Sequence, residues 1–128
     1  MIRFVIAICV IALLAIAALA LTPVTVTDQD NGKTIDVFRF RTIKLTLDSN
    51  PTTGYSWQLR APGDGKVLQL YFTTFRLPKT RLVGAGGREE WKFRAMAPGS
   101  VVIRTEYLRP WEKPEAPVKT FTLTVRVR

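Results

Sequence analysis

The sequence contains no histidine, and its only cysteine, Cys9, lies inside an apolar N-terminal stretch. A serine or cysteine nucleophile activated by histidine is therefore excluded, and so is a zinc site made of histidine and cysteine. One cysteine cannot form a disulfide framework within the chain. These absences argue against an ordinary hydrolase, and we expect no metal ion and no cofactor.

Acidic residues are few compared with basic ones. The 128 residues, a length typical of one domain, include 19 Lys and Arg against 10 Asp and Glu, which gives a formal net charge of +9. Such a charge can favour nucleic acid, an anionic membrane surface or an acidic protein. The basic residues are spread singly, without a run. This spacing argues against nucleic acid and is typical of a solvated basic surface.

The N-terminus resembles a targeting segment. Residues 4–21 carry no charge, follow Arg3 and include the small residues Ala18 and Ala20. This layout predicts a secretory signal over residues 1–20 with an A-x-A cleavage site. The alternative is an uncleaved membrane anchor, because the apolar run is barely long enough to span a bilayer. Both interpretations place the domain outside the cytoplasm as an exported protein, which is periplasmic, secreted or anchored.

The domain boundaries follow from the same pattern. Cleavage after Ala20 would remove only Arg3 among the charged residues and leave a charge of +8. Residues 21–33 are polar and turn-rich, and we interpret them as a linker that can include an edge strand over Val24–Thr27. Residues 34–128 form the predicted folded domain.

The rest of the chain has the period of β-strands. Apolar residues alternate with polar ones in segments 43–48, 88–95 and 120–127, with Glu89 on the apolar face and Glu90 on the solvent face. Segments 55–59, 67–75 and 101–108 are rich in β-branched and aromatic residues. Clusters of Gly, Pro and Asn separate these segments. The pattern predicts an all-β fold, an immunoglobulin-like β-sandwich, with a small barrel as the alternative.

The first of three unusual loops is rigid by composition. It consists of Asn50, Pro51, Thr52, Thr53, Gly54 and Tyr55. Pro51 fixes its own φ and favours an extended Asn50, while Gly54 permits a positive φ. We expect a stiff loop that presents two hydroxyl groups. The alternative is an ordinary turn that leads into a core strand.

The other two loops combine glycine or proline with apolar residues. The second contains Val83, Gly84, Ala85, Gly86 and Gly87, and the third contains Arg109, Pro110 and Trp111. The alternatives are a hairpin tip for the second and a tryptophan folded over the sandwich edge for the third. Alternate loops of an immunoglobulin-type sandwich emerge at one end, so the three loops would form a wedge suited to binding.

The segments NPTTGYSW, GAGG and RPW, in this order, resemble the chagasin family of cysteine-peptidase inhibitors. The resemblance extends from about residue 42 to the C-terminus. It implies an immunoglobulin-like sandwich that is no enzyme and reversibly inhibits papain-like cysteine peptidases. In this family three adjacent loops fill the active-site cleft, and a single copy suffices, so we expect a monomer.

The resemblance also implies a role for each loop. Residues 50–55 would lie over the catalytic cysteine of the peptidase. Residues 84–87, with Val83 ahead of them, would lie along the non-primed side. Trp111, presented by Arg109 and Pro110, would pack against the primed-side wall near the catalytic histidine.

Two other classes of function stay open at this stage. An envelope immunoglobulin-like domain could bind another protein or a cell-wall polymer through the same loops. An enzyme would need catalysis by Asp, Glu, Lys or Tyr, but Glu89 and Glu90 alternate across a strand and form no close carboxylate pair. We expect no nucleic-acid partner, and membrane contact only where the N-terminal segment is uncleaved.

Overall fold

The computed structural model describes residues 22–77, 86–114 and 116–128. Within these residues the chain forms eight strands and two short 3-10 helices, η1 (Asp28–Asp30) and η2 (Pro51–Thr53). The strands are β1 (Val24–Thr27), β2 (Thr34–Val37), β3 (Thr42–Ser49), β4 (Ser56–Ala61), β5 (Leu68–Arg76), β6 (Gly87–Ala95), β7 (Gly99–Leu108) and β8 (Lys119–Val127).

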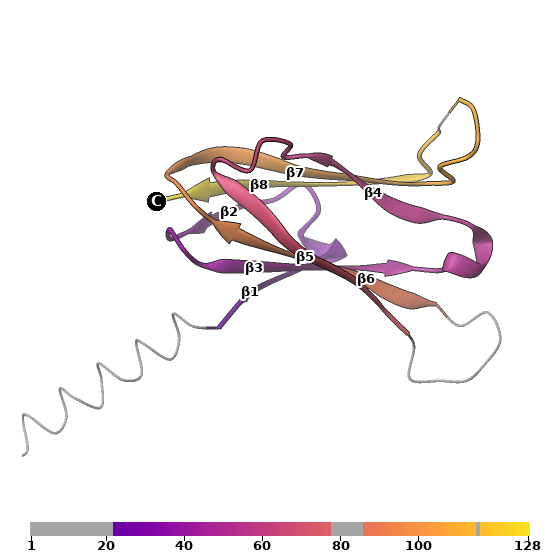
Figure 1. Ribbon diagram of the computed structural model, residues 1–128, viewed down its shortest axis with the longest axis horizontal. Coiled ribbons are helices and arrows are strands. Elements are labelled where there is room, and N and C mark those ends of the chain that lie inside the picture. The colour runs from indigo at the N-terminus through magenta and orange to yellow at the C-terminus, as the bar shows by residue number, and fades with distance from the viewer. Residues whose placement is uncertain (1–21, 78–85, 115) are drawn as a thin grey trace, which may run out of the picture.

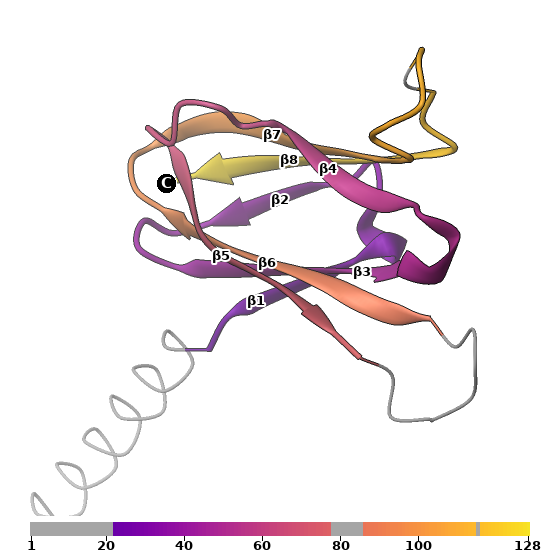
Figure 2. The same ribbon diagram turned by 45° about the vertical axis from the view of Figure 1, so that its right-hand side comes forward.

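The strands form two layers of four (Figure 1). One sheet has the order β1-β3-β6-β5 and the other has the order β2-β8-β7-β4. The strand β1 is parallel to β3 and β2 is parallel to β8, whereas the other pairs are antiparallel. The turned view shows the two layers facing each other (Figure 2). The all-β sandwich predicted from the sequence is therefore confirmed.

The core lies between the inner faces of the two sheets. It includes Ile43, Leu45 and Leu47 of β3 and Phe121, Leu123 and Val125 of β8, all buried. Their spacing of two residues places them on one face of each strand, as the alternation in the sequence predicts. Burial of these apolar side chains is the main term that stabilises the sandwich.

The chain enters the sandwich earlier than residue 34. The strand β1 pairs with β3 from Val24 to Thr27, and Val26 is buried in the core. A capping box then starts η1, because Asp30 accepts a hydrogen bond from the Thr27 N–H at 3.0 Å. The turn carries the chain across to β2 in the opposite sheet. The edge strand expected over Val24–Thr27 is therefore present as β1, and residues 24–30 belong to the sandwich.

Glu90 differs from the sequence-based expectation. It lies on the outer face of its sheet, as predicted, but the residue is only 1% exposed. Its carboxylate accepts a hydrogen bond from Arg76 Nε at 2.9 Å and lies 3.7 Å from Lys44 Nζ. The long side chains of neighbouring strands cover this position, so the outer face is not fully solvated there.

The predicted N-terminal signal or anchor rests on residues that lie outside those described. In the described part of the chain, no helix is long and apolar enough to cross a membrane.

Candidate functional site

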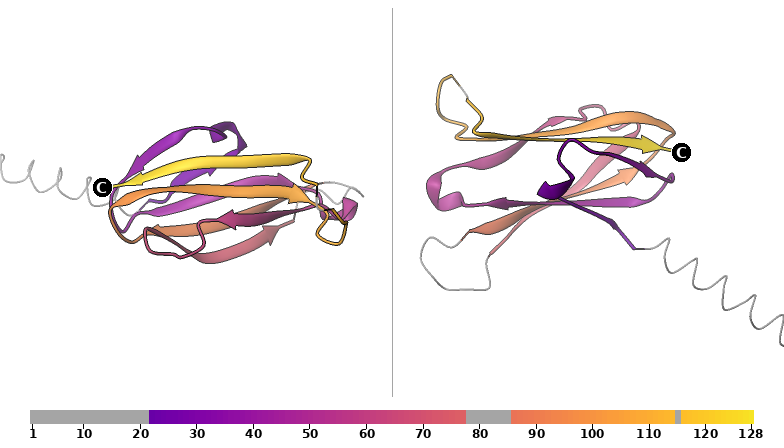
Figure 3. Two further views of the ribbon diagram at one scale, coloured as in Figure 1. Left: turned by 90° about the horizontal axis from the view of Figure 1, so that it is seen from above. Right: turned by 180° about the vertical axis from the view of Figure 1, so that it is seen from behind.

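The described residues of the three loops singled out in the sequence lie at one end of the sandwich. Ser49 pairs with Gly87 at the last rung of β3 and β6, and Ser56 pairs with Leu108 at the last rung of β4 and β7. The first and third loops project beyond these rungs, opposite the C-terminus (Figures 1 and 3). The topology therefore brings together residues that are far apart in the sequence.

The first loop is closed by its own hydrogen bonds. Asn50 caps η2, since its Oδ1 accepts from the Thr52 N–H at 3.3 Å and from the Thr52 hydroxyl at 2.6 Å. The Thr53 hydroxyl donates to the Asn50 carbonyl oxygen, also at 2.6 Å. Both hydroxyl hydrogens are thus used inside the loop. The exposed oxygens of Thr52 and Thr53 therefore face solvent as hydrogen-bond acceptors.

Gly54 connects the first loop to the third. Its φ of +79° lies in the left-handed region, where glycine is favoured. A Cβ at this position would clash with Cη2 and Cζ2 of Trp111. The indole ring therefore packs directly over the Gly54 backbone, while Trp111 stays 67% exposed. Trp111 therefore rests on the neighbouring first loop and still presents most of its surface to solvent.

Arg109 joins the same two loops with polar contacts. Its Nε donates to the Thr53 carbonyl oxygen at 3.1 Å, and its Nη1 donates to Glu112 at 3.0 Å. Its guanidinium carbon also lies 4.5 Å from the centre of the Tyr55 ring. The hydrogen bond to Glu112 raises the pKa of Arg109 above its ordinary value. An arginine side chain is charged at physiological pH in any case.

Three aromatic rings pack together where the first loop joins the strands. The Tyr55 ring lies 5.4 Å from that of Tyr107, which lies 5.0 Å from that of Trp57. The Tyr107 hydroxyl accepts a hydrogen bond from the Asn50 N–H at 3.0 Å, and the Trp57 indole donates to the Asp48 carbonyl oxygen at 2.9 Å. The start of the first loop is thereby fixed to both sheets.

Only part of the second loop lies within the described residues. Val83, Gly84 and Ala85 are outside them. Gly86 is exposed, and a Cβ there would lie 3.4 Å from the Ser49 carbonyl oxygen, so this end of the loop approaches the first loop closely. Gly87 is buried, and a Cβ there would clash with Arg76 and Phe75. The absence of a side chain at Gly87 thus permits close packing of β5 against β6. Gly86 is the described residue of the second loop that is exposed to solvent.

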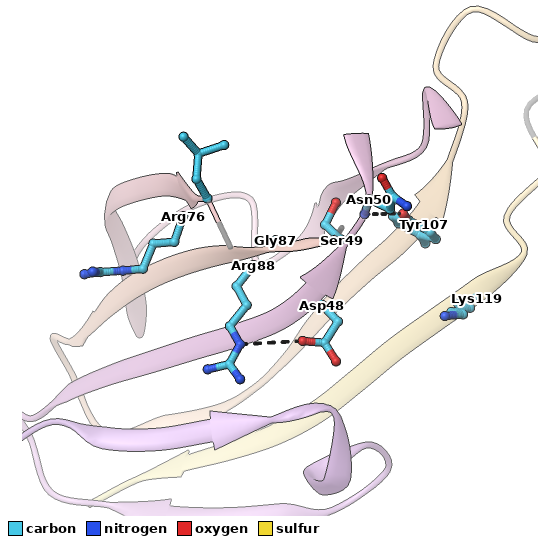
Figure 4. Close-up of a pocket in the computed structure, with 10 residues that line it drawn as sticks. Asp48, Ser49, Asn50, Arg76, Gly87, Arg88, Tyr107 and Lys119 are labelled. Atoms are coloured by element: carbon cyan, nitrogen blue, oxygen red, sulfur yellow. Dashed lines mark hydrogen bonds and ion pairs between the residues drawn. The ribbon is translucent and has the colours of Figure 1, made fainter. Parts of the chain in front are cut away.

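A pocket opens between the first and second loops (Figure 4). Its lining includes three cationic side chains, those of Arg76, Arg88 and Lys119. Among the described residues that line it, the one carboxylate is that of Asp48, which lies 3.7 Å from Arg88 Nε. The pocket is consequently positive, which would favour an acidic partner during diffusional encounter.

The structure adds supporting residues that sequence reasoning missed. Tyr107, Glu112 and Glu89 all contact the loops or the strand beside them. Glu89 accepts the Trp57 backbone N–H at 3.0 Å and so connects β6 to β4. For Glu89 the sequence contained one indication of this role: a glutamate on the apolar face of a strand requires a polar partner.

Comparison with known proteins identifies the family. The family model described as "Chagasin family peptidase inhibitor I42" matches residues 37–125. Chagasin of Trypanosoma cruzi is 31% identical over 104 residues, which cover 79% of this chain and 94% of chagasin. Amoebiasin-1 of Entamoeba histolytica is 32% identical over 104 residues, which cover 81% of this chain and 99% of the relative.

A solved structure supports the same assignment. The crystal structure of a cysteine protease inhibitor from Entamoeba histolytica matches with a TM-score of 0.75 and 27% identity. The match covers 82% of this chain and 95% of that one. The prediction of a cysteine-peptidase inhibitor that is not an enzyme is confirmed, and the chain belongs to the chagasin family of peptidase inhibitors.

Proposed function

We propose that this chain inhibits papain-like cysteine peptidases by inserting its three adjacent loops into the active-site cleft. The observation that carries the proposal is the bracing of the first loop by the third. Arg109 donates to the Thr53 carbonyl oxygen, and Trp111 packs on Gly54. Such bracing supports binding because a loop that is ordered before docking loses little conformational entropy in the complex.

Each loop has a part in the proposed complex. Residues 50–55 lie over the catalytic cysteine, with Thr52 and Thr53 exposed at the tip. Residues 83–87 follow the non-primed side, and their exposed described residue is Gly86. Trp111 contacts the primed-side wall, where its exposed ring supplies the aromatic area that is common at interface hot spots.

The rigidity of the first loop also accounts for binding without cleavage. The hydrogen bonds of Asn50, Thr52 and Thr53 within the loop resist the extended backbone that a peptidase substrate must adopt. The carbonyl group of Thr53 is in addition held by Arg109. A bound loop therefore keeps its carbonyl carbons out of line with the catalytic thiolate.

Loop variants test this assignment. In a protein of residues 22–128, Trp111→Ala and the Thr52→Ala/Thr53→Ala double substitution should each weaken papain inhibition by at least about 1–2 kcal/mol. Trp111→Phe and Thr52→Ser/Thr53→Ser are matched controls that keep an aromatic ring or the hydroxyl groups, and their losses should be smaller. An unchanged inhibition constant in both alanine variants, with the sandwich folded, would contradict the loop assignment.

We further propose that the domain acts outside the cytoplasm. The support is the uncharged run of residues 4–21 behind Arg3, which is typical of a signal segment or an anchor. N-terminal sequencing of protein recovered from fractionated cells distinguishes the two. A start at or near Leu21 indicates cleavage, an intact N-terminus in the membrane fraction indicates an anchor, and recovery in the cytoplasm contradicts the proposal.

A further inference from the structure

The outer face of the sheet β1-β3-β6-β5 gathers cations that are scattered in the sequence. Alternation along the strands places Lys44, Arg76, Arg88, Lys92 and Arg94 on this one face. Asp48 and Glu90 are the acidic residues on the strands of the same face, and Glu90 is buried beneath Arg76. We call this surface the basic face. This face could not be recognised from runs of basic residues, because no two of its cations are adjacent in the chain.

Two cations of the basic face are paired with aromatic rings. Lys92 Nζ lies 4.9 Å from the centre of the Phe72 ring, and the Arg94 guanidinium carbon lies 5.7 Å from the centre of the Tyr71 ring. Within the described residues neither cation has a carboxylate partner. Phe72 and Tyr71 are 41% and 50% exposed. The face thus combines unneutralised charge with exposed aromatic surface.

The outer face of the opposite sheet differs in charge. There Arg60 and Arg104 pair with Glu106 at 2.8 Å and 3.3 Å, and Arg126 pairs with Asp36 at 3.2 Å. On the strands of this face three cations thus lie beside two carboxylates, which leaves a net charge of +1. The basic face, with five cations and two carboxylates on its strands, has a net charge of +3 and is the more positive of the two outer faces.

We infer that the basic face binds the surface of an anionic lipid bilayer. Cations attract anionic headgroups, and partly exposed Tyr and Phe rings suit the interfacial layer between headgroups and acyl chains. Nucleic acid fits less well, because the basic residues are spread singly along the chain without a run. The apolar run of residues 4–21 leads directly into β1, which belongs to this same sheet, and so brings the sheet close to a membrane during export or anchoring.

Such binding leaves the first and third loops of the proposed inhibitory site free. The basic face lies along the strands, whereas the first and third loops project from the strand ends (Figure 1). A domain that lies with this face on a bilayer therefore keeps Thr52 and Trp111 accessible. Arg76 and Arg88 of the basic face also line the pocket beside the loops, whereas Lys92 and Arg94 do not. Substitution of Lys92 and Arg94 should therefore change membrane binding without changing peptidase inhibition.

Sedimentation with vesicles tests the inference. All described strands and core residues lie within residues 22–128, so this part of the chain contains the folding unit, and its inhibition of papain verifies that it is folded. We expect it to sediment with vesicles of phosphatidylcholine and phosphatidylglycerol but not with phosphatidylcholine alone. Binding should be lost at about 1 M salt, where the Debye length is about 3 Å.

A pair of charge-matched variants locates the binding surface. Lys92→Gln/Arg94→Gln should lower the partition coefficient by roughly thirtyfold, since each cation near the surface accounts for roughly a fivefold gain. Arg104→Gln/Arg126→Gln removes the same charge from the opposite face and should change it by less than about threefold. Papain inhibition should be unaffected in both variants.

Three results would overturn the inference. The first is an absence of binding to anionic vesicles by a preparation that inhibits papain. The second is an equal decrease of the partition coefficient in the two double variants, which would mean that net charge alone attracts the domain to the vesicles. The third is weaker papain inhibition by Lys92→Gln/Arg94→Gln with vesicle binding retained, which would assign the face to the peptidase.

Discussion

At the scale of single residues, Gly54 holds the contact between the first and third loops. Its positive φ and the indole of Trp111 above it both exclude a side chain. Gly54→Ala should destabilise the domain by about 1–2 kcal/mol from the left-handed backbone alone, and it should also weaken papain inhibition because Trp111 must move. Thermal unfolding and the inhibition constant measure the two effects.

Gly32 provides the matched control for that substitution. It has the same φ of +79°, but a Cβ there would meet nothing within 4 Å. Gly32→Ala should therefore lower the stability through the backbone and leave inhibition as it is. Equal inhibition constants for the two variants would show that the contact of Trp111 with Gly54 does not matter for function.

The hydroxyl group of Tyr107 fixes the start of the first loop. Tyr107→Phe removes the acceptor of the Asn50 N–H and keeps the ring stack, so the free energy of unfolding should fall by about 1 kcal/mol. Tyr55→Phe is the control, because no hydrogen bond of the Tyr55 hydroxyl occurs in the part of the chain that is described. Equal denaturation midpoints for the two variants would count against this role of Tyr107.

At the scale of strands, Glu89 connects the two sheets beneath the loops. Its carboxylate accepts the Trp57 N–H at 3.0 Å. Glu89→Ala leaves this partly buried N–H without its acceptor and should lower the free energy of unfolding by about 1.5–3 kcal/mol, whereas Glu89→Gln keeps an acceptor and should lose less. Urea denaturation of both variants measures the difference, and equal losses would contradict the proposed connection.

Most strands could be predicted because the alternation of apolar and polar residues is visible within each short segment of the sequence. Segments 43–48 and 120–127 are read directly as β3 and β8, since every second residue is apolar. The short strand β2 was missed, because Thr34–Val37 offers only Ile35 and Val37 as apolar residues. Its stability depends on parallel pairing with β8, which is about 90 residues away in sequence and leaves no local pattern.

The loop motifs were visible in the sequence, but their mutual contacts were not. Pro51 and Gly54 indicate a rigid turn by their own conformational limits. The hydrogen bond from Arg109 to Thr53 joins residues 56 positions apart, and the fold alone brings them together. Sequence reasoning therefore identified candidate loops, while the geometry explains how the third supports the first.

At the scale of the whole molecule, the sandwich places the loops and most of the basic face on different parts of its surface. The described loop residues lie at one end of the strands, and the basic face lies along one sheet (Figure 1). In the proposed complex a positive pocket beside the loops would speed association with an acidic peptidase more than it would raise affinity. The fold thereby supports a binding protein whose action depends on shape and rigidity and requires no chemical step.

The most direct test of the central claim is a titration of papain with residues 22–128, followed with a fluorogenic peptide substrate. Tight inhibition predicts a linear fall of activity to zero at about one inhibitor per enzyme, with the inhibitor recovered uncut, because the braced loops fill the cleft without entering the reaction. Full activity at excess inhibitor, with the domain shown to be folded and several papain-like peptidases tried, would contradict the account.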